Sequence, residues 1–311
     1  MAVFRKHAWK YGLYTHPGTS KADNQDRMLL KTFETGKISA GLAVVADGMG
    51  GHSAGSLASS VGVDLIAAWW DKLCNNPDTN KMDVPYIKED VYKTMHDINQ
   101  HLLEYGRQND ITTGTTMSLL YLYDQNYLIA HVGDSRIYQY NPAPSGKRNK
   151  KNMVVEHKDE VTEPLEEKQD NIQAGLHQLT DDHSWVSQLV QKGLLTKEEA
   201  RLHPKRNLLL NCLGIEEGLK VSFYSGSFQS GDIFLLCSDG YYSLFADEEI
   251  ASDLQDLLKA GYSFQNMCEH MIGSALQRKA QDNISIILLS PMLLGKKMRL
   301  TNVLQKLLRG N

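Results

Sequence analysis

Three long apolar runs in this chain carry an aspartate at their ends, and they constrain the fold more than any other feature. They read LAVVADG, LIAHVGD and IFLLCSDG and contain Asp47, Asp134 and Asp239. A fourth acid, Asp282, opens the apolar run DNISIILL. A strand that is apolar almost throughout is covered on both faces, so an acid at its end lies at the rim of a packed sheet. Four carboxylates gathered at one rim repel each other unless cations neutralise them, so the pattern predicts a hard-metal site.

The composition is that of an ordinary soluble globular protein, with 41% hydrophobic and 23% charged residues. A net charge of −4 gives no overall basic field, so we expect no nucleic-acid partner. The four cysteines show no CxxC pairing, which favours reduced thiols. The first residues lack the apolar core of a secretion signal, and no apolar stretch approaches the roughly 20 residues that span a bilayer. We therefore expect a cytoplasmic protein, and a monomer.

The pattern of apolar residues predicts helices and closely spaced strands in alternating groups. Helical spacing covers three regions: 53–73, 84–105 and 247–277. Strand patterns cover six segments: 38–46, 115–123, 127–132, 135–140, 221–225 and 232–238, and a last strand follows at 284–289. The short gaps after residue 115 indicate antiparallel hairpins, not helical crossovers. The sequence therefore predicts an α+β layered domain.

Two segments have a different character. Residues 141–175 are polar, with a basic block before an acidic one, and they predict a surface loop or a partly disordered extension. Residues 291–311 form a basic tail with apolar residues at helical spacing. This tail fits either a terminal helix docked on its own domain or a helix that meets a partner or an anionic membrane. Between these segments, Thr196 and Glu199 have the spacing of a capping box.

The acids support a two-metal site. Magnesium and manganese prefer oxygen ligands, and a carboxylate shared by two such ions makes a binuclear centre with metals roughly 3.5–4 Å apart. Two dications facing Asp47, Asp239 and Asp282 leave about one positive charge, which suits a hydroxide or a phosphate oxygen. The Gly48 carbonyl is a further candidate ligand. Each acid alone is weak evidence, because an aspartate before a glycine at a strand end is usually a turn former; only the joint occurrence favours the metal site.

Several ordered motifs resemble the metal-dependent protein phosphatases, the PPM or type 2C serine/threonine family, in its bacterial form. The matching stretches are NQD at 24–26, VVADGMGGHSAG at 44–55, TTGTT at 112–116, HVGDSRIYQY at 131–140, CSDGYYSLFADEEI at 237–250 and QDNISIILL at 281–289. The stretch 179–214 resembles the flap region of that family. The resemblance implies an αββα sandwich of two antiparallel sheets in one domain over 1–290, with the metal site at one end.

The resemblance also assigns roles to residues. Asp47 would bridge two core metals, with Gly48 offering its carbonyl to one of them, and Asp239 and Asp282 would bind the other. Asp26 matches the acid that holds metal-bound water. Asp134, together with Asp239, matches the acids of a third and weaker metal. Asp26, Asp47 and Asp239 are therefore the expected catalytic acids. Ser135 and Arg136 are expected to serve hairpin structure.

The chain departs from the family pattern at two positions. The family usually has an arginine that grips the substrate phosphate three residues before the Asn of NQD, and here that residue is Lys21. Lysine keeps the charge but loses the planar fork, so we expect weaker phosphate binding. Animal members carry a histidine where this chain has Met49; His52 is a candidate replacement, although a structural histidine is the simpler interpretation. We leave protonation of the leaving group to metal-bound water.

The resemblance implies a phosphatase acting on phosphoserine and phosphothreonine in proteins through water activated by Mn²⁺ or Mg²⁺. Its partners would be a phosphorylated protein substrate and a cognate serine/threonine kinase system. Two other functions stay open at this stage. One is a silent module that binds phosphorylated partners, and the other is a hydrolase of small phosphoesters at the same site.

Overall fold

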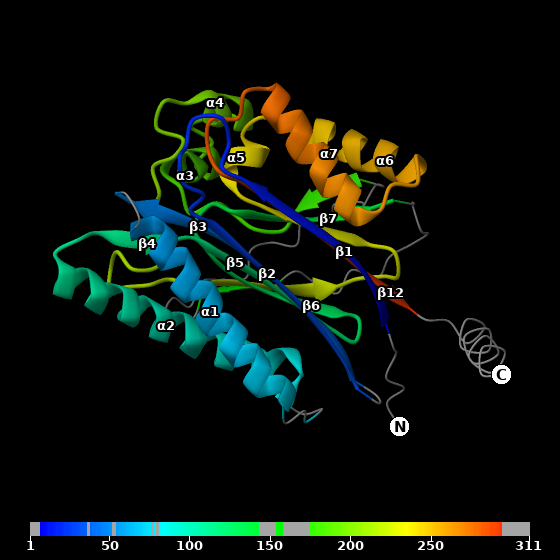
Figure 1. Ribbon diagram of the computed structural model, residues 1–311, viewed down its shortest axis with the longest axis horizontal. Helices are drawn as coiled ribbons and strands as arrows, with labels where there is room; N and C mark the ends of the chain where they lie inside the picture. Colours follow the sequence, from blue (N-terminus) through cyan, green and yellow to red (C-terminus); the bar gives the residue numbers. More distant parts are fainter. Residues whose placement is uncertain are drawn as a thin grey trace.

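The protein is a four-layered sandwich of helices and sheets. The computed structural model describes residues 7–35, 38–51, 54–75, 78, 81–142, 154–157 and 175–293. Within them, two sheets lie face to face and helices cover both outer sides (Figure 1). Every strand pairing among the described residues is antiparallel. The predicted αββα arrangement is therefore confirmed.

The larger sheet has the strand order β2-β3-β5-β6-β10-β8, and β4 pairs with β3 beside this path. Its strands are β2 (Asp26–Thr35), β3 (Ile38–Gly50), β4 (Thr113–Thr115), β5 (Met117–Tyr123), β6 (Asn126–Val132), β8 (Val154–His157) and β10 (Ser222–Ser227). Two long helices, α1 (Ala54–Asn75) and α2 (Val84–Asn109), cover its outer face.

The smaller sheet has the strand order β1-β12-β11-β7-β9. Its strands are β1 (His7–His16), β7 (Arg136–Asn141), β9 (Gly175–Gln178), β11 (Ile233–Cys237) and β12 (Ile284–Leu293). The helices α5 (Asp239–Tyr242), α6 (Asp247–Lys259) and α7 (Phe264–Gln277) belong to its outer side. The flap, residues 179–214, carries α3 (Trp185–Gln191) and α4 (Lys197–Leu202) above one end of the sandwich (Figure 1).

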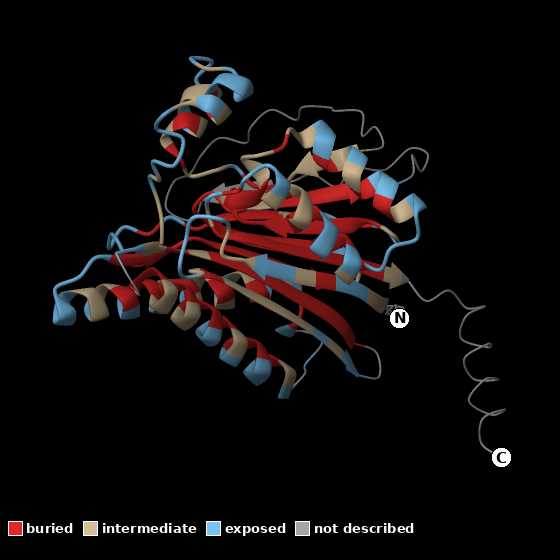
Figure 2. Cartoon of the chain, turned by 45° about the horizontal axis from the view of Figure 1, so that its top comes forward, coloured by how far each residue is buried: buried red, intermediate tan, exposed pale blue. Residues whose placement is uncertain are grey.

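The central strands are apolar on both faces because each face meets a different layer. In β3, Leu42 and Val44 pack with the helices, whereas Ala43 and Val45 pack between the two sheets. The central strands are almost entirely buried, while the outer sides of the helices are largely exposed or intermediate (Figure 2). This double burial explains why the runs in the sequence lack the polar alternation of a half-exposed strand.

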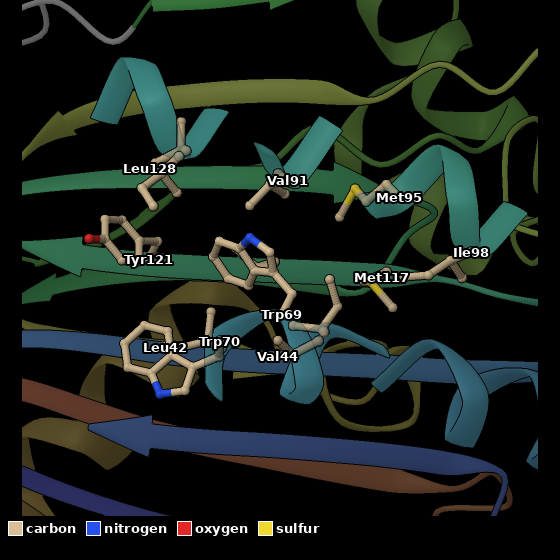
Figure 3. Close-up of a cluster of buried hydrophobic side chains, with 14 of the residues drawn as sticks. Leu42, Val44, Trp69, Trp70, Val91, Met95, Ile98, Met117, Tyr121 and Leu128 are labelled. Carbon is tan, nitrogen blue, oxygen red and sulfur yellow. The ribbon is translucent and has the colours of Figure 1, made fainter. Parts of the chain in front are cut away.

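Aromatic side chains fill the layer between the larger sheet and its helices. Figure 3 shows Trp69 and Trp70 of α1 among Leu42, Tyr121 and Val91. The indole Nε1 of Trp69 donates a hydrogen bond to Asp90 Oδ2 at 2.8 Å, so its polar atom is satisfied. This packing fixes α1, whose first residues approach the end of β3.

The structure corrects several predicted boundaries. The strands β1 and β2 were not predicted, because their mixed polar and aromatic residues suit partly exposed strands at the sheet edges and give no continuous apolar run. The strand predicted to end at residue 46 continues to Gly50, where it pairs with β4. The predicted helical region 247–277 is confirmed and contains two helices, separated at Gly261, whose φ is 76°.

The two unusual segments also need correction. The strand β8 lies within 141–175 and pairs with β10, so that part is not a loop, while 143–153 and 158–174 lie outside the described residues. The strand β12 continues to Leu293, beyond the predicted start of the tail at 291, and residues 294–311 also lie outside the described part. Of the described helices, none combines the length and apolar character needed to cross a bilayer. All four cysteines are free thiols.

Candidate metal centre

Asp47 and Asp26 lie opposite each other on neighbouring strands of the larger sheet. They are register partners, because β2 begins with Asp26 where β3 reaches Asp47. The backbone of Asp47 is fixed by Thr116, whose Oγ1 accepts a hydrogen bond from the Asp47 amide at 2.9 Å. The next residue, Gly48, must be glycine, because a Cβ there would collide with the carbonyl oxygen of Gly55. The end of β3 is thus pressed against the start of α1.

Asp239 and Asp282 come from the smaller sheet. Asp239 begins the short helix α5 directly after β11, and Asp282 lies two residues before β12. Asn283 ties this corner to the other sheet, since its Oδ1 accepts from the Gln25 amide at 2.9 Å. The amide group of Asn283 also donates to the carbonyl oxygens of Pro17 and Asp23, each at 3.0 Å. The carboxylates of the two sheets are thereby brought to one end of the sandwich.

Asp134 lies in the turn between β6 and β7 and is 6% exposed. The turn is joined to Thr116 through Ser135, whose hydroxyl oxygen lies 2.9 Å from Thr116 Oγ1. Thr116 therefore contacts the backbone of Asp47 and the Asp134 turn together. The TTGTT motif signalled this threonine in the sequence, but no role was assigned to it.

The predicted acids line one pocket. Asp47, Gly48, Asp134, Asp239 and Asp282 all contribute to a cavity of 470 Å³. Asp26 lies directly behind it, 2% exposed, and its Oδ2 accepts a hydrogen bond from Ser238 at 2.7 Å. Within the described part of the chain, however, no three histidine, cysteine or carboxylate side chains already have the spacing of a closed metal site. The acids therefore surround one cavity, but their side chains are not at the distances of a closed metal site.

Burial and mutual repulsion raise the pKa values of four carboxyl groups: Asp26, Asp47, Asp134 and Asp239. Burial is the larger cause and neighbouring aspartates add to it; the pKa of Asp26 rises to about 7 and that of Asp239 to about 6. The pKa values of Asp47 and Asp134 lie well above the ordinary range for the same reasons. A hydrogen bond with Asp47 partly opposes the rise in the pKa of Asp239. Such a cluster needs protons or cations for neutrality.

The donor set fits hard divalent ions. The candidate ligands are all oxygen atoms, which magnesium and manganese prefer. Asp26 Oδ1 is buried and has no hydrogen-bond partner among the described residues. A buried carboxylate oxygen without a partner is costly, and it is satisfied when an ion or its hydration water occupies the adjoining space. The residues present therefore fit the metal centre that the sequence predicts.

Lys21 lies at the same pocket and contacts one of the acids. Its Nζ is 3.1 Å from Asp282 Oδ1. Arg206 of the flap, which the sequence analysis did not single out, favours the ionised form of Asp239 and so opposes the rise of its pKa. Met49 lines the pocket, and His52 lies outside the described residues.

The flap is bound to the Asp134 turn at its base. The guanidinium of Arg136 donates to both carboxylate oxygens of Asp182, at 2.9 and 2.7 Å, and lies over the ring of Tyr242. The amide of His183 donates to the carbonyl of Gly133 at 2.7 Å. Arg136, which was predicted to serve the hairpin itself, therefore joins the hairpin to the flap. The predicted capping box of the flap is also confirmed, because Thr196 and Glu199 exchange their hydrogen bonds at the start of α4.

Fold and site together define the class of this molecule: an antiparallel sandwich with a carboxylate pocket at one end is the architecture of a metal-dependent phosphatase. The model of the family "Protein phosphatase 2C" matches residues 18–288. The chain belongs to this family.

Curated and solved proteins agree with that assignment. The chain is 30% identical over 249 residues to the serine/threonine phosphatase stp of Listeria monocytogenes, an alignment that covers 79% of this chain and 83% of the relative. It is 29% identical to the protein phosphatase PhpP of Streptococcus pneumoniae, with 89% and 96% covered. The solved serine/threonine phosphatase of S. agalactiae superposes with a TM-score of 0.70 at 27% identity, covering 91% of this chain and 99% of that one.

Proposed function

We propose that this protein is a serine/threonine protein phosphatase that hydrolyses phosphoserine and phosphothreonine at a binuclear magnesium or manganese centre. The observation that carries the proposal is the convergence of Asp47, Asp134, Asp239 and Asp282 on one pocket, with Lys21 at the same pocket. Membership of the protein phosphatase 2C family supports the same chemistry. The expected cofactors are two core ions of Mn²⁺ or Mg²⁺ and a third, weaker one.

Each of the two sheets would contribute ligands to the metal ions. Asp47 and the Gly48 carbonyl come from the larger sheet, and Asp239 and Asp282 from the smaller one. Asp134 would complete the weaker position. When bound, such ions acidify water and neutralise charge on a phosphate that is attacked in line.

The surrounding side chains would position the reactants. Asp26 lies behind the pocket; its Oδ2 accepts from Ser238, and its Oδ1, which has no partner among the described residues, would accept a further hydrogen bond. Lys21 would contact the substrate phosphate as a single cationic donor. The hydrogen bonds around Thr116 and Asn283 would keep the acids in place during reaction, which is what electrostatic catalysis requires.

The biological setting is part of the proposal. The substrate would be a phosphorylated protein made by a cognate serine/threonine kinase, in the cytoplasm. We assign the catalytic domain to the chain up to the end of β12 at Leu293, with the flap at 179–214. The catalytic domain of a serine/threonine protein phosphatase with this fold, PstP, has been solved in complex with two manganese ions; it superposes with a TM-score of 0.66 at 22% identity.

The decisive assay is release of phosphate from a phosphothreonine peptide with and without Mn²⁺. We expect activity that requires the metal and falls by about 100-fold or more in Asp239→Asn, because even outer partners of metal sites matter by roughly 10–100-fold. Asp256→Asn is the matched control, since it removes the same charge from an exposed pair on α6. Full activity in excess chelator would refute the proposal. Hydrolysis of nucleotides but not of the phosphopeptide would reassign the substrate.

A further inference from the structure

Asp282 is an expected metal ligand, and it already forms an ion pair with a cationic side chain of the protein, Lys21. The distance from Lys21 Nζ to Asp282 Oδ1 is 3.1 Å, and both side chains line the pocket. Of the described residues that line it, Lys21 is the one with a positive charge, against four aspartates. Its ammonium therefore supplies the positive charge closest to Asp282 in the absence of ions.

The backbone around Lys21 is fixed, although its side chain is half exposed. On one side, both the amide and the hydroxyl of Thr19 donate to the carbonyl of Ala280, at 2.8 and 2.9 Å. On the other side, the carbonyl of Asp23 accepts from Asn283 at 3.0 Å. The side chain of Lys21 is 50% exposed. The lysine is thus held at the pocket while its long stem remains able to turn.

We propose that Lys21 is an internal counter-ion of the metal centre, which a divalent ion displaces from Asp282 and which then becomes available to a phosphate. This inference rests on the proposed function, because it assumes that Asp282 is a metal ligand. A dication approaching Asp282 must break the pair with Lys21 and is also repelled by the ammonium. Lys21 therefore weakens metal binding when no phosphate is present.

A phosphate reverses the sign of that effect. Once Lys21 has left Asp282, its ammonium can bind a phosphate held in the same pocket. The negative charge of the phosphate then offsets the repulsion between the ammonium and the metal. Metal and phosphate then bind with positive cooperativity, because both favour the Lys21 side chain in the position away from Asp282. Linkage is reciprocal, so the factor by which phosphate relieves the effect of Lys21 on metal affinity equals the factor by which bound metal increases the contribution of Lys21 to phosphate affinity.

The effect is expected to be modest, because both partners are partly exposed. Exposed ion pairs contribute between zero and about 1 kcal/mol, which corresponds to at most about fivefold in an equilibrium constant. We therefore expect Lys21→Met to bind Mn²⁺ about two- to fivefold more tightly than the wild type in a phosphate-free buffer. The measurement is isothermal titration calorimetry on the full chain.

Two variants control this result. Lys21→Arg keeps the charge and should stay within about twofold of the wild type. Lys31→Met removes a lysine of the same charge from an ion pair with Asp71, at 2.6 Å, and neither partner lines the pocket. Its affinity for Mn²⁺ should equal that of the wild type. Thermal unfolding of each variant without metal shows that the fold is retained.

A second titration tests the other half of the inference. Inorganic phosphate added to the Mn²⁺-saturated proteins should bind about two- to fivefold more weakly to Lys21→Met, while Lys31→Met behaves as wild type. If Lys21 had a purely structural role, its substitution would not strengthen the binding of Mn²⁺ and weaken the binding of phosphate.

The outcomes separate this inference from the proposed function. Equal Mn²⁺ affinity in the wild type and Lys21→Met would overturn the inference alone, as would an equal gain in Lys31→Met. Unchanged phosphate affinity in Lys21→Met would overturn it too. No Mn²⁺ binding by the wild-type protein would overturn the proposed function and the inference with it.

Discussion

At the residue scale, Lys21 and arginine differ in the shape of the charge that they present to a phosphate. An ammonium offers single hydrogen bonds, whereas the guanidinium fork binds two oxygens at once. We expect Lys21→Arg to lower the Michaelis constant for a phosphothreonine peptide by about three- to tenfold, with the turnover number little changed. Steady-state kinetics at saturating Mn²⁺ measure it, with Lys31→Arg as the control. An unchanged or higher Michaelis constant would argue against phosphate contact by residue 21.

His131 shows how burial changes a group that has no place in the proposed chemistry. It is fully buried on β6, with Nδ1 2.9 Å from Ser118 Oγ and Nε2 3.1 Å from the carbonyl of Asp181. Burial lowers its pKa from 6.5 to about 4, partly offset by hydrogen bonds to the backbone. The ring is therefore neutral in the folded protein at pH values where the unfolded chain binds a proton.

The sign of the resulting pH dependence follows directly. Since the folded pKa lies below the unfolded one, the contribution of His131 to stability is complete above pH 6.5 and is lost as the pH falls toward 4. The loss reaches about 3 kcal/mol at pH 4. We expect the difference in free energy of unfolding between the wild type and His131→Gln to shrink over this range, measured by urea denaturation. A difference that stays constant from pH 7.5 to 5 would contradict the assignment.

At the element scale, the flap is bound to the sandwich by a partly buried ion pair. Arg136 is 22% exposed and Asp182 11%, and the carboxylate accepts two hydrogen bonds from the guanidinium. Asp182→Asn would leave the guanidinium without its counter-ion, and we expect a loss of about 3 kcal/mol in the free energy of unfolding. Chemical denaturation measures this loss. The exposed pair of Asp71 with Lys31 provides the control, because Asp71→Asn should change stability by less than about 1 kcal/mol. Equal losses in the free energy of unfolding of both variants would show that the flap ion pair stabilises the fold no more than an exposed pair does.

Burial on both faces made some strands recognisable in the sequence, while other strands stayed hidden. The strands β3, β5, β11 and β12 are packed on both faces, so their apolar runs were recognisable. The strand β1 was missed because it lies at a sheet edge, with Tyr11 and Tyr14 exposed, and its pattern is mixed. The strand β8 was missed for another reason: its residues stand in a strongly polar segment, and only pairing with β10 reveals them as a strand.

At the scale of the whole molecule, metal binding and folding should be coupled. The two sheets each bring carboxylates to the centre, so ions that neutralise them bind the folded chain and not the unfolded one. At 100 times the dissociation constant, a bound ion adds about 2.7 kcal/mol of stability, or about 5 °C in a protein of this size. We expect Mn²⁺ to raise the melting temperature by about that amount, measured by differential scanning fluorimetry.

Two comparisons make this result specific. The rise should be largely lost in Asp239→Asn and retained in Asp256→Asn, which keeps the pocket intact. Sodium chloride at the same ionic strength should not reproduce it, because screening acts on exposed charges and not on a buried cluster. An equal rise in Asp239→Asn would mean that the ion binds elsewhere.

The sequence by itself determined the layered α+β class, the central strands and the identity of the acids. A strand buried on both faces is a continuous apolar run, and an acid at its end is visible in that run. The tertiary structure decided which groups meet. Asp26 faces Asp47 only through strand register, and Thr116 and Asn283 acquire their positioning roles only when the sheets close on each other. The pairing of Lys21 with Asp282 joins residues from the two ends of the chain. Such contacts depend on distances between segments far apart in sequence, and the pattern of a single segment carries no information about them.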